Sequence, residues 1–500
     1  MSVPHRVRVV GAGLAGLTAA HAVRRHADAA GVDVDLRVLE ASDQVGGQLR
    51  TVDEDGVRFD WAANAFRTGA GPTADLVARL GLEGERLEAK KAASKRFILH
   101  GGQLHELPSG PGTLLSFRPM SLKGRLRIAL EPFVARRVPD EESVFAYAAR
   151  HIGAEAAEVL LGTMVRGVYG GDVRRLSVDA AFPVMKTMER DHRSLVVAAI
   201  AGAKERKRVG KTTWTFRGGM QQLLYALADD LNAGAPRDGA ADGLEDGAAD
   251  GAGGGAGGGG DVVRLNAPVS ALARRAEGGY TLATPHGEDE TADAVVLAVG
   301  PQVARTLVAD AAPDLAGALD AIPTGHLAIA TFAFDDAAFE RPAEGYGFLV
   351  APSEPVDVLG ALFESNIFDD RAPAGTTLVR VIMGGAGRDD VVAKDDAALR
   401  ETALGVLDQA LGLREAPKRA WTWRQPYAIP QYELGHHDRV AAIEGHLAAL
   451  PGVQVAGNAY RGVAVGAIVE DAERLAERIL AHAHAQGAGA APAAPAGVAA

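Results

Sequence analysis

The 500-residue sequence contains no cysteine, so it forms no disulfide bond and performs no chemistry that needs a thiol. It also lacks an HExxH motif and any carboxylate cluster at metal-ligand spacing, so we expect no metal site. Acidic residues outnumber basic ones, and the formal net charge is −12. A charge of this sign argues against nucleic acid as the main partner.

Long apolar runs are missing as well. The longest apolar stretch near the middle, Leu195 to Ala203, is far shorter than the roughly 20 residues that span a bilayer. A strand-like run begins by residue 7 and leaves no room for a removable N-terminal signal. We therefore expect a cytoplasmic protein without a transmembrane helix. The hydrophobic fraction of 47% is typical of a globular chain, and the length allows two or three domains.

The first forty residues carry a dinucleotide-binding fingerprint in its full context. A β-branched run from Val7 to Val10 leads into Gly11-Ala12-Gly13-Leu14-Ala15-Gly16, which opens an apolar helix. The glycines allow a tight turn, close approach of the backbone to a pyrophosphate, and close packing of helix on strand. The helix N-terminus attracts phosphate, and Glu40, after the next apolar run, is placed to bind a ribose hydroxyl. A glycine-rich turn without a ligand is the alternative.

A second glycine pair, Gly46-Gly47, stands just past this acidic residue. It lets the backbone run close to a long cofactor for a second time, a contact that NAD does not need. The pair therefore favours FAD over NAD, and an ordinary turn is the alternative.

Further motifs follow along the chain: Lys95-Arg96-Phe97-Ile98-Leu99, Arg166-Gly167-Val168-Tyr169-Gly170-Gly171-Asp172, Ile429-Pro430-Gln431-Tyr432-Glu433-Leu434-Gly435-His436 and Gly457-Asn458-Ala459-Tyr460-Arg461-Gly462-Val463-Ala464-Val465. In kind and order they resemble FAD flavoproteins of the amine oxidase and protoporphyrinogen oxidase type. The resemblance spans nearly the whole chain outside one insert and the tail.

This resemblance implies an α/β fold with a discontinuous, Rossmann-like FAD-binding domain, an antiparallel-sheet substrate domain and a helical domain that could touch a membrane. The expected segments are 1–70, 211–310 and 431–485 for FAD binding, 71–210 for the helical domain and 311–430 for the substrate sheet. A flexible Gly/Ala insert (233–260) and a disordered tail (486–500) complete the chain. The basic stretch Lys123 to Arg127, followed by Arg136-Arg137, would suit anionic lipid, or else be a solvated helix face.

The resemblance also implies which residues hold FAD: Gly11, Ala12, Gly13, Leu14, Ala15, Gly16, Glu40, Ala41, Gly47, Gln48, Ala62, Ala63, Asn64, Ala65, Val269, Val463, Ala464 and Val465. The sequence departs from the family pattern at Ala62-Ala63, where Gly-Pro is common. It departs again after Val465, where Gly466-Ala467-Ile468 replaces Asn-Asp-Cys.

For the substrate, the resemblance implies that Arg96 pairs with a propionate, because a guanidinium binds a carboxylate in a bidentate way. The resemblance also matches four residues to positions that line the substrate pocket: Gly167, Phe332, Val350 and Ile382. Packing in the hydrophobic core explains the three apolar residues equally well. No catalytic side chain is assigned, since the flavin carries the redox chemistry.

The implied reaction is oxidation of protoporphyrinogen to protoporphyrin by dioxygen in haem biosynthesis. Three alternative functions stay open. The protein could be a coproporphyrinogen oxidase, a different flavin oxidase of the amine oxidase or carotenoid desaturase type, or a non-catalytic FAD-binding scaffold. The expected partners are a porphyrinogen and dioxygen, with a membrane surface (a peripheral location on the inner membrane) and the next haem-pathway enzyme as candidates.

Overall fold

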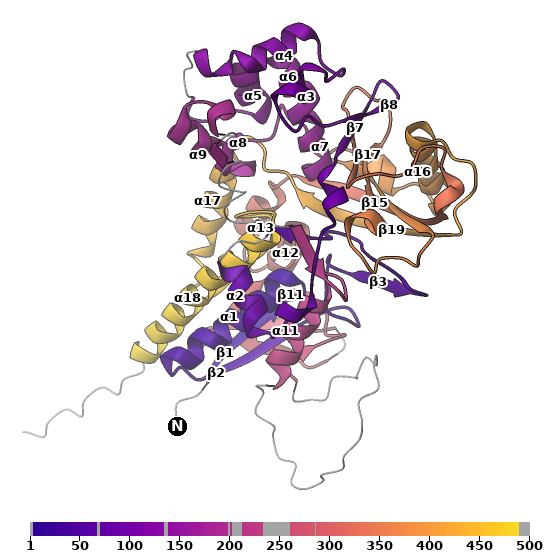
Figure 1. Cartoon of the computed structure of the whole chain (residues 1–500). Coiled ribbons are helices and arrows are strands. Elements are labelled where there is room, and N and C mark those ends of the chain that lie inside the picture. Colours follow the sequence, from indigo (N-terminus) through magenta and orange to yellow (C-terminus); the bar gives the residue numbers. More distant parts are fainter. Residues whose placement is uncertain are drawn as a thin grey trace, which may run out of the picture. The chain divides into compact units, whose positions relative to one another are not determined.

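The computed structural model describes residues 4–67, 71–134, 139–198, 201–202, 213–233, 261–285 and 287–489 (Figure 1). Most of the predicted insert and tail lies outside the described residues, as do Arg136 and Arg137. The chain forms two compact units, each assembled from separate stretches. Unit 1 comprises Met1–Gly47, Leu224–Asp320 and Ala442–Ala500, and unit 2 comprises Gln48–Leu223 and Ala321–Ala441. The finer segment boundaries stay a prediction.

Unit 1 is built on a five-stranded parallel sheet in the order β10-β2-β1-β14-β20. Its strands are β1 (His5–Val10), β2 (Val34–Leu39), β10 (Val263–Arg264), β14 (Ala294–Leu297) and β20 (Val453–Val455). Strand β14 is buried along its whole length, as expected of a parallel sheet covered on both faces. Helices α1 (Leu14–Ala30) and α18 (Val465–Gly489) pack against each other. This is the predicted discontinuous Rossmann-like sheet.

The rest of unit 1 is a small antiparallel sheet and two short helices. The sheet contains β11 (Ala271–Arg274), β12 (Tyr280–Ala283) and β13 (Glu290–Ala292). Helices α12 (Pro301–Val308) and α13 (Pro313–Asp320) follow β14 and pack on each other. Two further helices, α11 (Gln222–Ala233) and α17 (His436–Leu447), include residues of both units.

Unit 2 contains a seven-stranded sheet in the order β19-β15-β18-β17-β16-β7-β8. The strands are β7 (Phe97–His100), β8 (Gln103–Glu106), β15 (Thr324–Asp335), β16 (Gly347–Val350), β17 (Val358–Phe363), β18 (Thr376–Gly385) and β19 (Arg419–Pro430). The strands within 311–430 pair antiparallel, as predicted, but the complete sheet is mixed, because β7 from outside that segment pairs parallel with β16. The hairpin β7–β8 comes from the region predicted as helical and extends the sheet by long-range pairing. No tight turn joins β7 to β16, so the two strands are not forced to run antiparallel, and the sheet is mixed.

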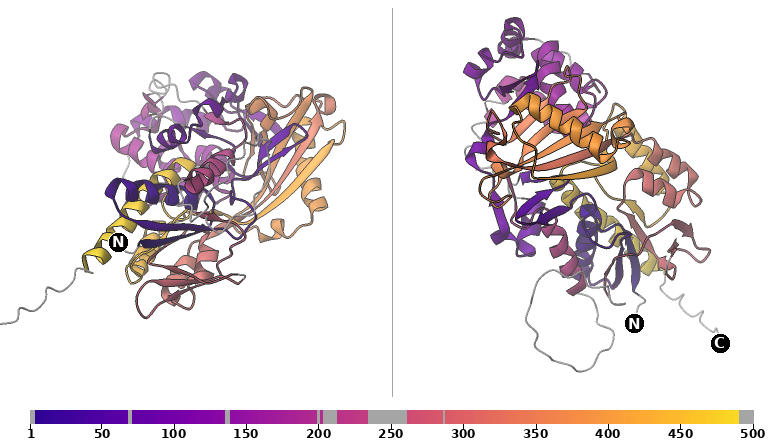
Figure 2. Two further views of the ribbon diagram at one scale, coloured as in Figure 1. Left: turned by 90° about the horizontal axis from the view of Figure 1, so that it is seen from below. Right: turned by 90° about the vertical axis from the view of Figure 1, so that its right-hand side faces the viewer.

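The two faces of this sheet have different surroundings. Successive side chains of a strand point to opposite faces, and residues paired across two strands share a face. One face packs against α16 (Asp396–Leu411), which lies across the strands in Figure 2. The side chains of Phe332, Val350 and Val381 belong to that core. Ile382 and Leu349 lie at the alternate positions and therefore on the opposite face.

The remaining elements of unit 2 are mostly helical. They are β3 (Thr51–Glu54), β4 (Val57–Asp60), β5 (Phe66–Arg67), α2 (Pro72–Arg79), η1 (Glu83–Glu85), β6 (Arg86–Glu88), η2 (Lys91–Ser94), α3 (Pro111–Leu115), α4 (Leu122–Ala129), η3 (Glu131–Phe133), α5 (Val144–Ile152), α6 (Ala154–Ala156), η4 (Ala157–Gly162), α7 (Thr163–Tyr169), α8 (Val178–Ala181), α9 (Pro183–His192), β9 (Thr213–Phe216), η5 (Asp336–Ala338), α14 (Glu364–Ile367) and α15 (Asp389–Val392). Serine side chains cap the N-termini of three of these helices: Ser121 on α4, Ser143 on α5 and Ser177 on α8.

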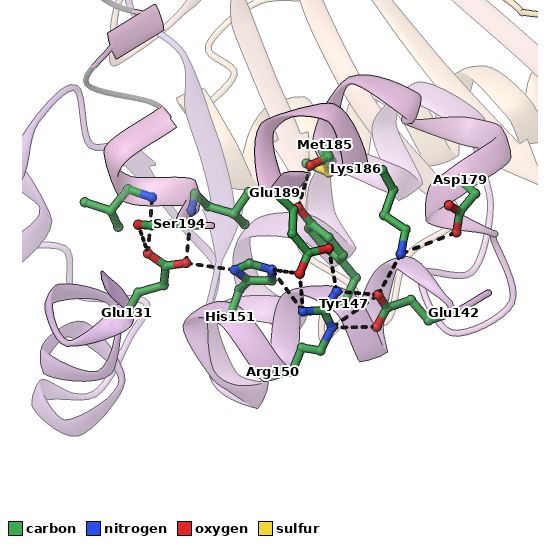
Figure 3. Close-up of polar contacts among 12 residues, drawn as sticks. Glu131, Glu142, Tyr147, Arg150, His151, Asp179, Met185, Lys186, Glu189 and Ser194 are labelled. Atoms are coloured by element: carbon green, nitrogen blue, oxygen red, sulfur yellow. Dashed lines mark hydrogen bonds and ion pairs between the residues drawn. The ribbon is translucent and has the colours of Figure 1, made fainter. Parts of the chain in front are cut away.

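A buried chain of charged groups ties these helices together (Figure 3). His151 is fully buried, and its Nδ1 and Nε2 lie 2.7 Å and 3.1 Å from carboxylate oxygens of Glu131 and Glu189. Arg150 bonds both Glu189 and Glu142, which also accepts from Lys186 at 3.2 Å. Carboxylates alternate with basic side chains along this chain of groups, so each buried carboxylate has a basic hydrogen-bonding partner.

Within the described parts of the chain, helices long and apolar enough to cross a membrane are absent.

Candidate functional site

The start of α1 in unit 1 has the geometry of a phosphate site. Strand β1 ends at Val10, α1 begins at Leu14, and Gly13 is its N-cap in extended backbone. No side chain caps this end, so the first N–H groups of a 17-residue helix are left for a ligand.

The three glycines of the turn are required for different reasons. Gly11 has φ +102°, and a Cβ there would lie 2.8 Å from the carbonyl oxygen of Ala298. At Gly16, a Cβ would lie 1.8 Å from the carbonyl oxygen of Gly11. At Gly13, however, it would meet nothing nearer than the Cα of Gly47, at 3.8 Å. The protein's own packing therefore requires Gly11 and Gly16, while a glycine at 13 keeps space for a bound group.

Glu40 is fixed at the ends of β1 and β2. One carboxylate oxygen accepts from the Ala12 N–H at 2.7 Å, and the other accepts from the N–H and hydroxyl of Ser42. A carboxylate has about four lone-pair positions, so it can still accept from a ribose hydroxyl. The Ala267 N–H donates to the Glu40 carbonyl at 2.8 Å, which brings the chain just before Val269 to this strand end. These residues fit a dinucleotide cofactor.

Unit 1 holds most of the other predicted cofactor residues. Val463 and Ala464 immediately precede α18, which begins at Val465, and Ala464 is exposed. Ala41 and Gly47 are also exposed, and a backbone bridge pairs Gly13 with Gly46.

The predicted cofactor residues of unit 2 are Gln48 and the loop Ala62–Ala65. A buried ion pair fixes this loop: Arg380 Nε lies 2.8 Å from Glu364 Oε1, and both side chains are 1% exposed. Arg380 Nη1 donates to the Ala62 carbonyl at 2.6 Å and also to the Asp60 carbonyl. Glu364 accepts from the side-chain amide of Asn64 at 3.0 Å and 3.2 Å. The sequence analysis missed both charged residues, which lie some 300 positions beyond the loop in the sequence.

Arg96, the predicted propionate ligand, is exposed just before β7. Its guanidinium carbon lies 5.0 Å from the ring centroid of Tyr346. Burial, together with the charge of Glu364, raises the pKa of Tyr346 above its ordinary value, against the opposing effect of Arg96. Arg96 and the 62–65 loop belong to the same unit.

The other predicted substrate residues separate into two groups. Ile382 lies half-buried on the sheet face opposite α16, and Gly167 meets that face through Leu349. A Cβ at Gly167 would lie 2.4 Å from a methyl group of Leu349, so α7 packs on β16 only with glycine there. Phe332 and Val350 are completely buried in the α16 core, which is the plain packing alternative for these two residues. The structure does not bring them to the same face as Ile382.

The hydroxyl of Thr51, near the second glycine pair, donates to the buried Asp60 at 2.6 Å. Among the described residues, no group of three or more His, Asp or Glu side chains is placed to hold a metal ion.

Comparison with known proteins matches residues 14–480 to the family of flavin containing amine oxidoreductases. The chain is 29% identical to protoporphyrinogen oxidase of Bos taurus, over 95% of this chain and 98% of the bovine protein. It is 30% identical to coproporphyrinogen III oxidase of Propionibacterium freudenreichii subsp. freudenreichii, over 94% and 90% of the two chains. The structure of a protein from Exiguobacterium sp. 255-15, assigned to the protoporphyrinogen oxidases, has the same fold. Its TM-score is 0.79 at 24% identity, with 96% of this chain and 99% of that one covered. The chain belongs to the flavin containing amine oxidoreductases, and its cofactor is FAD.

Proposed function

We propose that this protein oxidises a porphyrinogen to the porphyrin with dioxygen as the electron acceptor, and that its substrate is protoporphyrinogen. The observation that carries the proposal is the exposed guanidinium of Arg96, at the edge of a largely apolar sheet face in the unit that also holds the 62–65 loop. The full-length similarity to proteins named for porphyrinogen oxidation supports it.

The residues of the chain supply binding and orientation. Arg96 would hold a substrate carboxylate in a bidentate pair, which fixes both position and direction. Apolar side chains such as Leu349 and Ile382 would contact the macrocycle and exclude water. When bound, FAD would supply the redox chemistry between the porphyrinogen and dioxygen.

The charge of the sheet face supports a substrate with two propionates over one with four. On the face of β16, β17 and β18 opposite α16, the paired residues are Gly347, Leu349, Gly360, Leu362, Arg380 and Ile382. The only charged side chain among them, Arg380, is buried and bound to Glu364. A face with few free cations suits the two propionates and two vinyl groups of protoporphyrinogen. Coproporphyrinogen, with four propionates, is the second candidate, because a coproporphyrinogen III oxidase is among the relatives.

Steady-state porphyrin fluorescence with each porphyrinogen tests the proposal. A desolvated charge-assisted pair contributes about 1.5–3 kcal/mol, so Arg96→Ala should raise the apparent KM about ten- to a hundredfold with unchanged flavin content. Arg96→Lys should recover only part of the loss, because an ammonium cannot form the bidentate pair. Lys95→Ala is the matched control: Lys95 is a neighbouring exposed cation that pairs with Glu344, and its removal should leave KM unchanged. Normal kinetics for Arg96→Ala, or a clear preference for coproporphyrinogen, would contradict the proposal.

We also propose that α4 docks on a membrane surface. Leu122, Leu126 and Leu130 repeat every four residues and are 60%, 48% and 56% exposed, and Phe133 is 84% exposed. Such a stripe beside basic residues is typical of an interfacial helix. Leu126→Glu should abolish flotation with vesicles that contain phosphatidylglycerol. Val184→Glu, at an exposed apolar position on α9, should not change it. A wild-type protein that stays off such vesicles would contradict this proposal.

A further inference from the structure

The segment 41–45 of unit 1 connects two contacts that the chain makes with Ala12. Before the segment, Glu40 Oε2 accepts from the Ala12 N–H at 2.7 Å, and after it the Gly46 N–H donates to the Ala12 carbonyl at 3.0 Å. Residues 41–45 form bends rather than a helix or a strand. Side-chain hydrogen bonds therefore help to fix this segment, and the side chain of Ser42 contacts two acceptors in it.

The hydroxyl of Ser42 lies between these two acceptors. Its oxygen is 2.7 Å from Glu40 Oε1 and 2.8 Å from the carbonyl oxygen of Gln44. A serine hydroxyl has one proton, so it donates to one acceptor at a time. The carboxylate is the stronger acceptor, because hydrogen bonds to a charged group are roughly twice as strong as bonds between neutral groups. Ser42 can therefore act on Glu40 or on the turn at Gln44, and the charge favours Glu40.

The carboxylate of Glu40 is fixed from both sides. Oε1 accepts from the Ser42 N–H at 2.9 Å and from the Ser42 hydroxyl, and Oε2 accepts from the Ala12 N–H. A carboxylate has about four lone-pair positions, so these three donors leave one position, on Oε2. A ribose hydroxyl would meet an acceptor that is already oriented, and its binding would cost less conformational entropy.

We propose that Ser42 is a positioning residue for the adenosine ribose of FAD and that it acts through Glu40. Its hydroxyl holds Oε1 of the carboxylate, so that Oε2 offers its remaining lone pair in a fixed direction. The inference rests on the predicted ribose role of Glu40 and is independent of the substrate that the enzyme oxidises. Every residue of the argument lies within Met1–Gly47 of unit 1.

The test uses the full-length apoprotein and two probes that differ only in the ribose hydroxyls, ADP and 2′,3′-dideoxy-ADP. Their dissociation constants are measured by competition with FAD, whose fluorescence reports binding. A hydroxyl paired with a carboxylate contributes about ten- to a hundredfold in affinity, so wild type should prefer ADP by at least about tenfold. Ser42→Ala should reduce this preference at least about threefold. The preference is a ratio measured on one preparation, so a fraction of unfolded protein does not change it.

Three further variants assign the effect to the contact with Glu40. Ser42→Thr keeps a hydroxyl and should keep the preference within about twofold of wild type. Glu40→Gln should remove most of the preference, because a neutral amide is the weaker acceptor. Adding Ser42→Ala to Glu40→Gln should then change the preference less than about twofold. Thr306→Ala is the control: this exposed hydroxyl of α12 donates to the Gln302 carbonyl at 3.2 Å, and its loss should leave both dissociation constants unchanged.

An unchanged or greater preference for ADP in Ser42→Ala would overturn the inference. If both probes also bind more weakly by the same factor, the hydroxyl acts only on the turn at Gln44. A wild-type protein that binds the two probes equally, or binds neither, would contradict the ribose role of Glu40 and overturn the inference with it. The probes contain no porphyrin, so each of these outcomes leaves the proposed oxidation of a porphyrinogen to its own test.

Discussion

Arg380 and Glu364 form an ion pair with 2.8 Å between Nε and Oε1, and each side chain is 1% exposed. The pair brings β18 and α14 to the backbone of the 60–62 turn and to Asn64. The pair therefore holds the loop to which we assign cofactor contacts, and Arg380 lies on the sheet face to which we assign substrate contacts.

The first prediction concerns the stability of this pair. Arg380→Ala leaves the Glu364 carboxylate and two backbone carbonyls buried without their partner, and removal of one member of a buried pair costs about 3–5 kcal/mol. Denaturant unfolding followed by circular dichroism should show a loss of this size. Arg217→Ala removes an exposed pair with Asp370 and should scarcely change the unfolding midpoint. Equal midpoints for the two variants would contradict the assignment of Arg380.

The second prediction concerns acid stability. Burial acts to raise the pKa of Glu131, but hydrogen bonds from His151, Ser194 and the backbone at Leu195 and Val196 outweigh it and lower the pKa. A carboxyl group with a lowered folded-state pKa stabilises the fold above its unfolded pKa, and this contribution disappears as the pH falls through the folded-state value. Wild-type stability should therefore decline below the ordinary glutamate range.

The Glu131→Gln variant isolates this contribution. It should be less stable than wild type at neutral pH and should lose less stability on acidification, because the titrating group is gone. Thermal unfolding from pH 7 to pH 3 measures both slopes. Parallel pH profiles for the two proteins would show that Glu131 does not couple to folding in this way.

The third prediction separates the glycines of the turn. Gly13→Val should yield a folded protein without FAD, since the side chain meets only ordinary contacts from the protein but occupies the space of the pyrophosphate. Gly16→Val should fail to fold stably, because its Cβ overlaps the Gly11 carbonyl. Visible absorbance after gel filtration measures FAD, and circular dichroism measures the fold. A yellow Gly13→Val protein would contradict the reading.

A fourth prediction concerns the attachment of FAD. The chain has no cysteine, and residues 46–51 contain no histidine, so we expect the cofactor to be held without a covalent bond. Denaturation with trichloroacetic acid should release all the flavin into the supernatant. Flavin that precipitates with the protein would show covalent attachment.

Local sequence patterns were sufficient to predict the first strand–helix–strand segment of unit 1, since the turn at Gly11 to Gly16 and Glu40 both lie within it. Long-range features were not accessible in this way. The parallel pairing of β7 with β16 depends on residues about 250 positions apart. The role of the Arg380–Glu364 pair is visible only from its contacts with residues 60–64, which lie far from it in the sequence. The sheet face on which Phe332 lies was also not predictable, because β15 is buried on both faces from Ala328 to Phe334 and therefore lacks the polar–apolar alternation that distinguishes two faces.

The central claim, FAD-dependent oxidation of protoporphyrinogen, is tested most directly by anaerobic reduction of the purified holoenzyme. We predict that protoporphyrinogen IX bleaches the flavin absorbance, that air restores it, and that coproporphyrinogen III bleaches it at least about tenfold more slowly, because its two additional carboxylates would meet an apolar face without a paired cation. A flavin that neither porphyrinogen bleaches would contradict porphyrinogen oxidation altogether. Faster bleaching by coproporphyrinogen III would contradict the choice of substrate.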